Sequence, residues 1–254
     1  GEGGQLAVYF IAVIATELGK VVSKETKIDI LVTPLVTIGS GVAVSALLAP
    51  TLGAIAMKVG DLIMLATNLQ PFWMGIAVSV LVGVALTLPI SSAAICAAFG
   101  LTGLAGGAAV AGCCAQMVGF AVMSFRENKW GGLVSQGIGT SMLQMGNIIK
   151  NPRIWIAPIV TSAITGPLAT CLFKLQMNGT PVSSGMGTCG LVGQIGVYTG
   201  WMNDIEAGSK TAVTAKDWVG LILISFVLPA VLCPLINMVV RKLGWVKDGD
   251  MTLS

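Results

Sequence analysis

Long apolar stretches separated by short polar ones run through the chain at intervals that suit membrane-crossing helices. A helix needs roughly 20 apolar residues to cross about 30 Å of hydrocarbon. Because each stretch is continuous and does not alternate between apolar and polar residues, the pattern predicts helices and disfavours a β-barrel. The six predicted spans are residues 5–22, 30–57, 71–91, 104–123, 154–173 and 218–240.

The second stretch is longer than an upright span requires. It contains Gly39, Gly41 and Pro50, and each of these residues is a plausible break point in a helix. An alternative division cuts the stretch near Ala49 and makes 50–69 a separate span, which would place Lys58 and Asp61 at membrane depth. The sequence leaves both divisions open.

Two further segments, 133–149 and 183–202, are half apolar and rich in glycine and polar side chains. Irregular backbone at membrane depth is tolerated only where it is buried in protein or lines a wet cavity. Transporters place their solute sites at such broken elements. We therefore predict an all-α membrane protein with about six transmembrane helices plus two re-entrant hairpin-like segments. The alternative is that both segments are interfacial loops whose small residues pack between helices.

Short motifs hint at an internal duplication. The tetrapeptide PLVT at 34–37 resembles PIVT at 158–161, and PISS at 89–92 resembles PVSS at 181–184. A third pair joins GLAG at 103–106 to GLVG at 190–193. The order is the same in both halves but the spacings differ, so a repeat and a chance match both remain open.

Composition supports lipid as the main solvent. Of the 254 residues, 55% are hydrophobic and 10% charged, whereas a soluble domain carries about 25% charged residues. Because no linker-like stretch interrupts the chain, we expect a single transmembrane domain over 1–254. The chain opens with Gly1-Glu2-Gly3-Gly4 and no methionine, so we expect the natural protein to begin further upstream.

The residue inventory argues against enzymatic chemistry. The chain has no histidine, and none of its six cysteines forms a C-x-x-C pair. A catalytic residue, a metal and a cofactor are therefore not expected. The basic residues are scattered, so nucleic-acid binding has no support either.

Orientation follows weakly from the basic loops. Residues 124–153 and the tail after the last span carry all three arginines, and the positive-inside rule places both regions in the cytoplasm. Lys20, Lys24 and Lys27 would then face outward, which counts against this orientation.

Neutral amides and hydroxyls are the candidate binding groups, because they hydrogen-bond uncharged solutes and are poor proton carriers. The predicted solute site comprises Gln194, Thr188, Gln144 and Asn147, with Gln136 next. Under the competing interpretation these side chains only join helix to helix.

Three runs carry a resemblance to a known family. They are NPRIWIAPI at 151–159, GPLAT at 166–170 and GMGTCGLVGQ at 185–194, with KETKID at 24–29 and the following Thr33-Pro34 fitting the same pattern. The chain resembles the membrane component, enzyme IIC type, of bacterial sugar phosphotransferase systems, and is most similar to a compact IIC-like branch.

The resemblance implies a multi-pass protein of the bacterial plasma membrane. It also implies a homodimer, re-entrant hairpins around a solute site, and cytoplasmic phosphotransferase-system proteins as partners. The chain departs from the sugar permeases in three ways: it has no histidine, no Gly-Ile-Thr-Glu type motif, and no fused IIA or IIB domain.

The sequence therefore predicts a permease for a small, uncharged, sugar-like solute. Two alternatives stay open. One is a regulatory or sensory membrane protein of the same fold that binds a small molecule or lipid, and the other is an ion-coupled secondary transporter.

Overall fold

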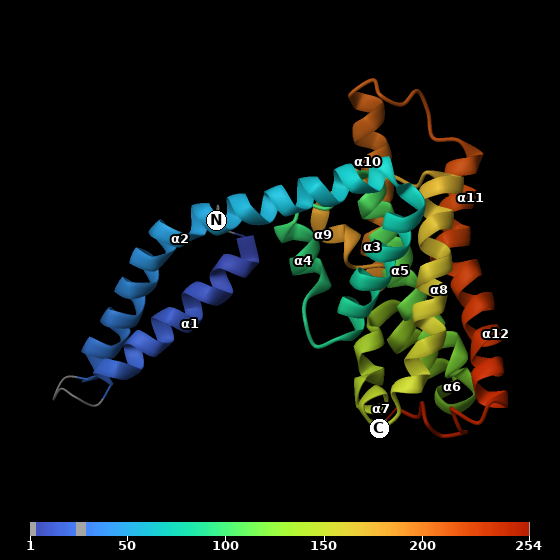
Figure 1. Cartoon of the computed structure of the whole chain (residues 1–254), viewed down its shortest axis with the longest axis horizontal. Helices are drawn as coiled ribbons and strands as arrows, with labels where there is room; N and C mark the ends of the chain where they lie inside the picture. Colours follow the sequence, from blue (N-terminus) through green and yellow to red (C-terminus); the bar gives the residue numbers. More distant parts are fainter. Residues whose placement is uncertain (1–3, 24–28, 254) are drawn as a thin grey trace. The chain divides into compact units, whose positions relative to one another are not determined.

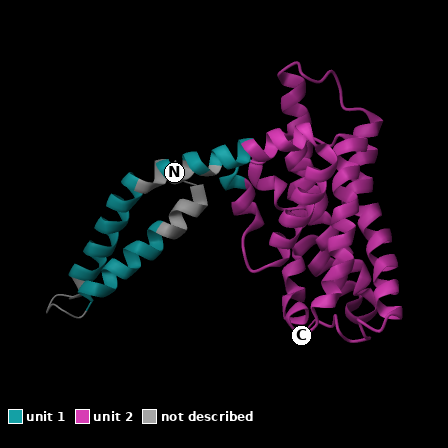
Figure 2. Ribbon diagram, in the orientation of Figure 1, with its two compact units in different colours: residues 1–61, 97–100 teal, residues 62–96, 101–254 magenta. Residues whose placement is uncertain are grey.

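The structure is a computed structural model that describes residues 4–23 and 29–253 (Figure 1). It divides into two compact units, which Figure 2 colours separately. Unit 1 comprises Gly1–Asp61 and Ala97–Gly100, and unit 2 comprises Leu62–Cys96 and Leu101–Ser254. Throughout the described ranges the regular structure is helical, without a β-strand, which confirms the all-α class. Our expectation of one domain over 1–254 stays a prediction.

Unit 1 is built from α1 (Gly4–Val22) and most of α2 (Asp29–Leu69). The two helices approach closely where α1 carries small residues. A Cβ at Gly19 would lie 2.2 Å from Oγ1 of Thr37, and a Cβ at Gly41 would lie 3.4 Å from that of Ala15. Small side chains at such crossings let membrane helices pack tightly.

The plausible break points in the second stretch do not interrupt it, because α2 continues as one helix of 41 residues through Gly39, Gly41 and Pro50. Division of the stretch near Ala49 is likewise not observed. Gly41 faces Ala15 of α1, and a Cβ there would lie at ordinary contact distance. Proline is tolerated in helices of membrane proteins because neighbouring groups satisfy the freed carbonyl.

The core of unit 2 forms around one central helix, α5 (Gly103–Met123), whose side chains are almost all buried. Three helices pack against it: α3 (Pro71–Thr87), α8 (Ile156–Pro167) and α12 (Leu228–Lys242). Residues 105–115 of α5 are mostly alanine, glycine and cysteine. This composition keeps the helix narrow enough to be enclosed on all sides.

Glycines set the spacing where α3, α5 and α8 meet. A Cβ at Gly112 would lie 1.8 Å from the carbonyl oxygen of Ser79, and one at Gly166 would lie 2.3 Å from that of Gly75. The hydroxyl of Ser79 also donates to the carbonyl of Ser162 at 2.7 Å. The backbones of the three helices are therefore in direct contact, and a methyl group at Gly112 has no space.

Two spans contain wide π-helical turns beside prolines. After Pro167, α8 continues as η4 (Leu168–Phe173), and α11 (Ala215–Ile222) passes through η6 (Leu223–Val227) into α12, which has Pro229 in its first turn. Proline removes a helical hydrogen bond, and a π-turn is one way to absorb the mismatch. The capping box of Thr214 and Asp217 fixes the start of α11.

Both half-polar segments are interrupted helices. The first passes from α6 (Phe125–Val134) through η1 (Ser135–Gly139) and η2 (Ser141–Gln144) to α7 (Met145–Lys150). The second begins with α9 (Pro181–Ser184) and the short turn η5 (Cys189–Leu191). Its second half differs from the expectation, because α10 (Val192–Glu206) is a regular helix.

Three helical stretches in the described part of the chain are long and apolar enough to cross a membrane: Gly103–Met123, Pro152–Phe173 and Ala215–Lys242. They coincide with three of the predicted spans. α3 is shorter than predicted because it ends at Thr87, just ahead of Pro89, and α4 (Ser92–Ala98) begins beyond that proline. The count of six spans and the re-entrant topology stay predictions.

The basic residues gather at one end of unit 2. Figure 1 shows α6, α7, the end of α12 and the chain's C-terminal end together there, with the α10–α11 connection at the opposite end. The basic end carries Arg126, Lys129, Lys150, Arg153, Arg241, Lys242 and Lys247, whereas the other end carries Lys174, Lys210 and Lys216. The positive-inside rule predicts that the basic end is cytoplasmic.

Candidate functional site

Three of the predicted site residues form a continuous series of hydrogen bonds. Nε2 of Gln144 donates to Oε1 of Gln136 at 2.9 Å, and Nδ2 of Asn147 donates to Oε1 of Gln144 at 2.9 Å. The series continues from Nε2 of Gln136 to the hydroxyl of Ser124 at 2.9 Å. Gln136 and Gln144 are fully buried, so these bonds replace water for groups that would be costly to bury alone.

The same amides bind the polypeptide that follows α12. Nε2 of Gln144 donates to the carbonyl of Met251 at 3.0 Å, and Nδ2 of Asn147 donates to that of Thr252 at 2.9 Å. Asn128 clamps this tail from α6, since it donates to the Met251 carbonyl at 2.8 Å and accepts from the Leu253 amide at 2.8 Å. Met251 is completely buried. Part of the predicted set therefore fixes residues 244–253 at the basic end.

Charged contacts add to this clamp. Arg241 binds Glu127 at 2.9 Å and also pairs with Asp248. The carboxylate of Asp250 accepts from the backbone of Lys247 and from the side chain of Asn151, both at 2.8 Å. The Lys247 backbone donor, the Asn151 amide and the charges of Lys247 and Arg241 hold the pKa of Asp250 below its usual range despite some burial.

Thr188 and Gln194 lie in the second interrupted segment. The hydroxyl of Thr188, which is fully buried, donates to the carbonyl of Gly137 at 2.5 Å and so joins this segment to η1. Nε2 of Gln194 contacts the sulfur of Cys114 at 3.2 Å, while its buried Oε1 has no hydrogen-bond partner. The structure thus brings Thr188 to the first segment and places Gln194 against the central helix.

A cleft of about 460 Å³ opens where the two interrupted segments meet the α3–α4 turn. Its polar lining consists of hydroxyls from Ser91, Ser92 and Thr140, together with the half-buried thiol of Cys189, and no charged side chain lines it. The remaining lining residues are Leu86, Pro89, Ile90, Ala93, Met142 and Met186. The cleft could hold a small, uncharged molecule.

The two PxSS motifs brace the wall of this cleft. The hydroxyl of Ser92 donates to the carbonyl of Gly185 at 2.7 Å, and that of Ser184 donates to the carbonyl of Leu101 at 2.7 Å. The final serine of each motif therefore anchors the segment that follows the other motif. The similarity between PISS and PVSS was the sequence signal that could have identified this face.

None of the five site residues predicted from the sequence lines the cleft. In the second segment, sequence reasoning selected Thr188 but not Met186 or Cys189. In the first segment it selected the amides of Gln136, Gln144 and Asn147 but not Thr140. The selection favoured amides, whereas the lining is made of hydroxyls and apolar side chains. Among the residues that the structure describes, no group of histidine, cysteine, aspartate or glutamate side chains could hold a metal ion.

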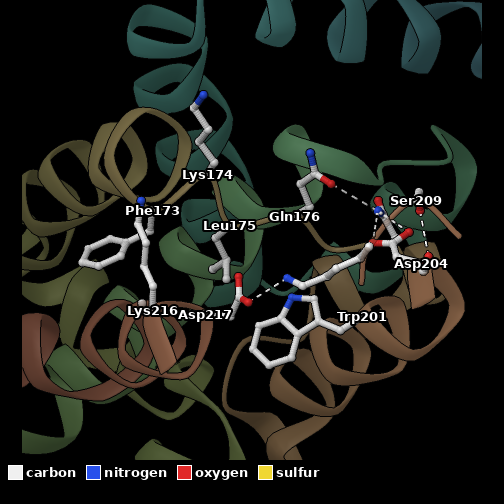
Figure 3. Close-up of a pocket in the computed structure, with 12 residues that line it drawn as sticks. Phe173, Lys174, Leu175, Gln176, Trp201, Asp204, Ser209, Lys216 and Asp217 are labelled. Carbon is white, nitrogen blue, oxygen red and sulfur yellow. Dashed lines mark hydrogen bonds and ion pairs between the residues drawn. The ribbon is translucent and has the colours of Figure 1, made fainter. Parts of the chain in front are cut away.

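A second pocket, of about 300 Å³, lies at the end of unit 2 opposite the basic end and is strongly charged (Figure 3). Some of its charged groups are partnered within the pocket, and Lys174 and Lys216 also line it. Lys210 pairs with Asp217 at 2.8 Å and lies 5.3 Å from the ring centre of Trp201. Nδ2 of Asn178 binds both oxygens of Asp204, at 3.0 and 2.8 Å. These contacts hold the α10–α11 connection in place.

The long apolar helices indicate a membrane protein, and a comparison with protein families identifies its family. The family model for the phosphotransferase system, EIIC, matches residues 1–253. The chain belongs to the phosphotransferase system EIIC family. A search of curated proteins and a search of solved structures found no match.

Membership of the EIIC family has direct consequences. An EIIC protein is an integral component of the plasma membrane and is the translocating part of the system, not its catalytic phosphotransferase. The family supports a general role as a sugar-transport permease that works with other components of the system. The resemblance noted in the sequence is therefore confirmed.

Proposed function

We propose that this EIIC protein is a permease that binds a small, uncharged, sugar-like solute in the cleft between the α3–α4 turn and the two interrupted segments. The observation that carries the proposal is the lining, which has three hydroxyls and no charged group. A carboxylate or phosphate would find no counter-charge there. Hydroxyl groups of a neutral solute would find both hydrogen-bond donors and acceptors.

The residues selected from the sequence have a place in this proposal. Thr188 precedes the lining residue Cys189, and Gln136 and Gln144 flank the stretch that carries the lining residues Thr140 and Met142. Gln194 lies outside the lining, and its buried Oε1 has no hydrogen-bond partner. We further propose that both segments are re-entrant, that the basic end is cytoplasmic, and that the protein acts as a homodimer.

Phosphorylation of the solute would require another component. The chain contains no histidine, so it cannot carry a phosphohistidine. We propose that a phosphoryl group for a bound solute comes from a cytoplasmic component of the phosphotransferase system. Translocation without phosphorylation is equally compatible with the cleft.

Uptake by proteoliposomes tests the proposal, with a panel of radiolabelled uncharged monosaccharides, disaccharides and sugar alcohols. We expect at least one to be accumulated or exchanged, and hexose phosphates not to compete. Ala93→Leu should reduce this uptake because Ala93 lines the cleft. Ala94→Leu, the same change one position along α4 but outside the lining, should leave it intact.

Three outcomes would replace the proposal. Binding without any uptake would favour the sensory alternative, and uptake that depends on a proton or sodium gradient would favour an ion-coupled transporter. Equal loss of uptake in Ala93→Leu and Ala94→Leu, with both proteins folded, would move the site away from this cleft.

A further inference from the structure

A narrow crevice of about 170 Å³ lies at the basic end of unit 2, between the end of α5, the start of α6 and the last turns of α12. It is separate from the solute cleft and shares no residue with it. Its lining combines apolar side chains with two arginines and one amide: Val122, Met123, Arg126, Pro234, Asn237, Met238 and Arg241.

The amide in this crevice lacks a partner. Asn237 is only 5% exposed, and its Oδ1 is buried without a hydrogen-bond donor. An unsatisfied buried acceptor costs free energy that folding alone does not recover. A donor from a molecule bound in the crevice, such as a hydroxyl group, would remove this cost.

The crevice also contains a cation that is not neutralised by an ion pair. Arg241 is paired with Glu127 and with Asp248, whose side chain is 93% exposed and therefore largely screened by water. Arg126 is exposed, and within the described residues no carboxylate lies in ion-pair distance of it. Glu127 compensates Arg241, so about one positive charge remains for an anionic ligand.

An apolar stripe leads away from the crevice along α12. Val231, Leu235 and Met238 follow one another at helical spacing and are 50%, 52% and 53% exposed. α12 belongs to the most hydrophobic of the candidate membrane spans. In a bilayer this face contacts acyl chains, and the crevice lies at its basic end, where lipid headgroups would be.

From these features we infer that the crevice binds one anionic phospholipid with a hydroxyl-bearing headgroup. The phosphodiester pairs with Arg126, and a headgroup hydroxyl donates to Oδ1 of Asn237. The acyl chains lie along the α12 stripe. A cationic headgroup would be repelled by the surplus arginine charge, and basic pockets between membrane helices are known hosts for anionic headgroups.

Native mass spectrometry of the full chain tests this inference, with phosphatidylglycerol, phosphatidylethanol and phosphatidylcholine offered in turn. Phosphatidylethanol has the same charge as phosphatidylglycerol but no free hydroxyl. We expect phosphatidylglycerol to bind most tightly, phosphatidylethanol less tightly and phosphatidylcholine least tightly. Arg126→Gln should weaken phosphatidylglycerol binding about fivefold, whereas Lys129→Gln, which removes a nearby cation outside the crevice, should not.

Asn237→Leu supplies the second arm of the test. It should abolish the preference for phosphatidylglycerol over phosphatidylethanol and leave the preference over phosphatidylcholine. Glycerol phosphate without acyl chains should not compete, because it cannot use the α12 stripe; effective competition would show a free-phosphate site. Equal binding of all three lipids, or an equal effect of Arg126→Gln and Lys129→Gln, would overturn the inference.

Discussion

Replacement of Gln144 by leucine tests whether the buried amide series supports the basic end of the molecule. Gln144 makes three hydrogen bonds, to Gln136, to the Met251 carbonyl and from Asn147. The leucine keeps most of the side-chain volume and removes all three. It should therefore isolate the polar contribution without opening a large cavity.

The magnitude follows from what each partner retains. The Met251 carbonyl still accepts from Asn128, and Asn147 still donates to Thr252, so these two losses should each cost about 0.6 kcal/mol, the mean for such contacts in membranes. Oε1 of Gln136 is left buried without its donor, which should lower the free energy of unfolding by about 1–3 kcal/mol. The free energy of unfolding should fall by about 2–4 kcal/mol.

Denaturant unfolding in detergent, followed by tryptophan fluorescence, measures this change. Gln70→Leu is the matched control, because Gln70 is exposed and its side chain makes no capping hydrogen bond to α3; its effect should stay within about 0.5 kcal/mol. The double variant Gln136→Leu with Gln144→Leu removes both partners, so it should cost at least about 1 kcal/mol less than the two single changes together. Strict additivity, or no effect of Gln144→Leu, would refute the reasoning.

Further predictions concern packing, pH and phosphotransfer. Gly112→Ala should cost about 3 kcal/mol or more, since its methyl would lie 1.8 Å from the Ser79 carbonyl, whereas Gly146→Ala has open space and should be tolerated; thermal unfolding compares them, and equal stability would contradict the packing. Folding lowers the pKa of Asp250. Its carboxylate should therefore stabilise the tail above the ordinary aspartate pKa, and this stabilisation should be lost as pH falls through the lower pKa of the folded protein. The rate at which a protease cleaves the tail should rise across this acid range in the wild type and not in Asp250→Asn. Incubation with labelled phosphoenolpyruvate and the general phosphotransferase proteins should leave this chain unlabelled, and stable label would contradict the absence of a phosphoryl carrier.

Much of the helical framework could be predicted from hydropathy alone. Three helical stretches of the described residues that are long and apolar enough to cross a membrane match predicted spans closely, because burial in lipid requires continuous apolar runs. The interruptions at 135–144 and 185–191 were also signalled by glycine and amide content. The continuity of α2 could not be predicted from the sequence, because only the packed structure shows that Gly41 contacts α1.

The partners of the amides could not be predicted, because they are distant in the chain. Gln144 binds a carbonyl 107 residues away, and Asn128 binds the same carbonyl from 123 residues away. The tail itself has no hydrophobic periodicity to mark it as buried. The cleft was missed for a different reason: its lining is made of hydroxyl and apolar side chains, which resemble ordinary packing residues in a sequence.

The reactivity of Cys189 tests the central claim most directly, since this half-buried thiol lines the proposed solute cleft and four of the other cysteines are buried. In a Cys171→Ser background, which removes the exposed thiol, a small maleimide should label Cys189 in the absence of solute. A saturating concentration of the sugar or sugar alcohol that supports uptake should slow labelling at least severalfold, and a hexose phosphate should not. Labelling at the same rate with and without the transported solute would contradict the assignment of this cleft as its binding site.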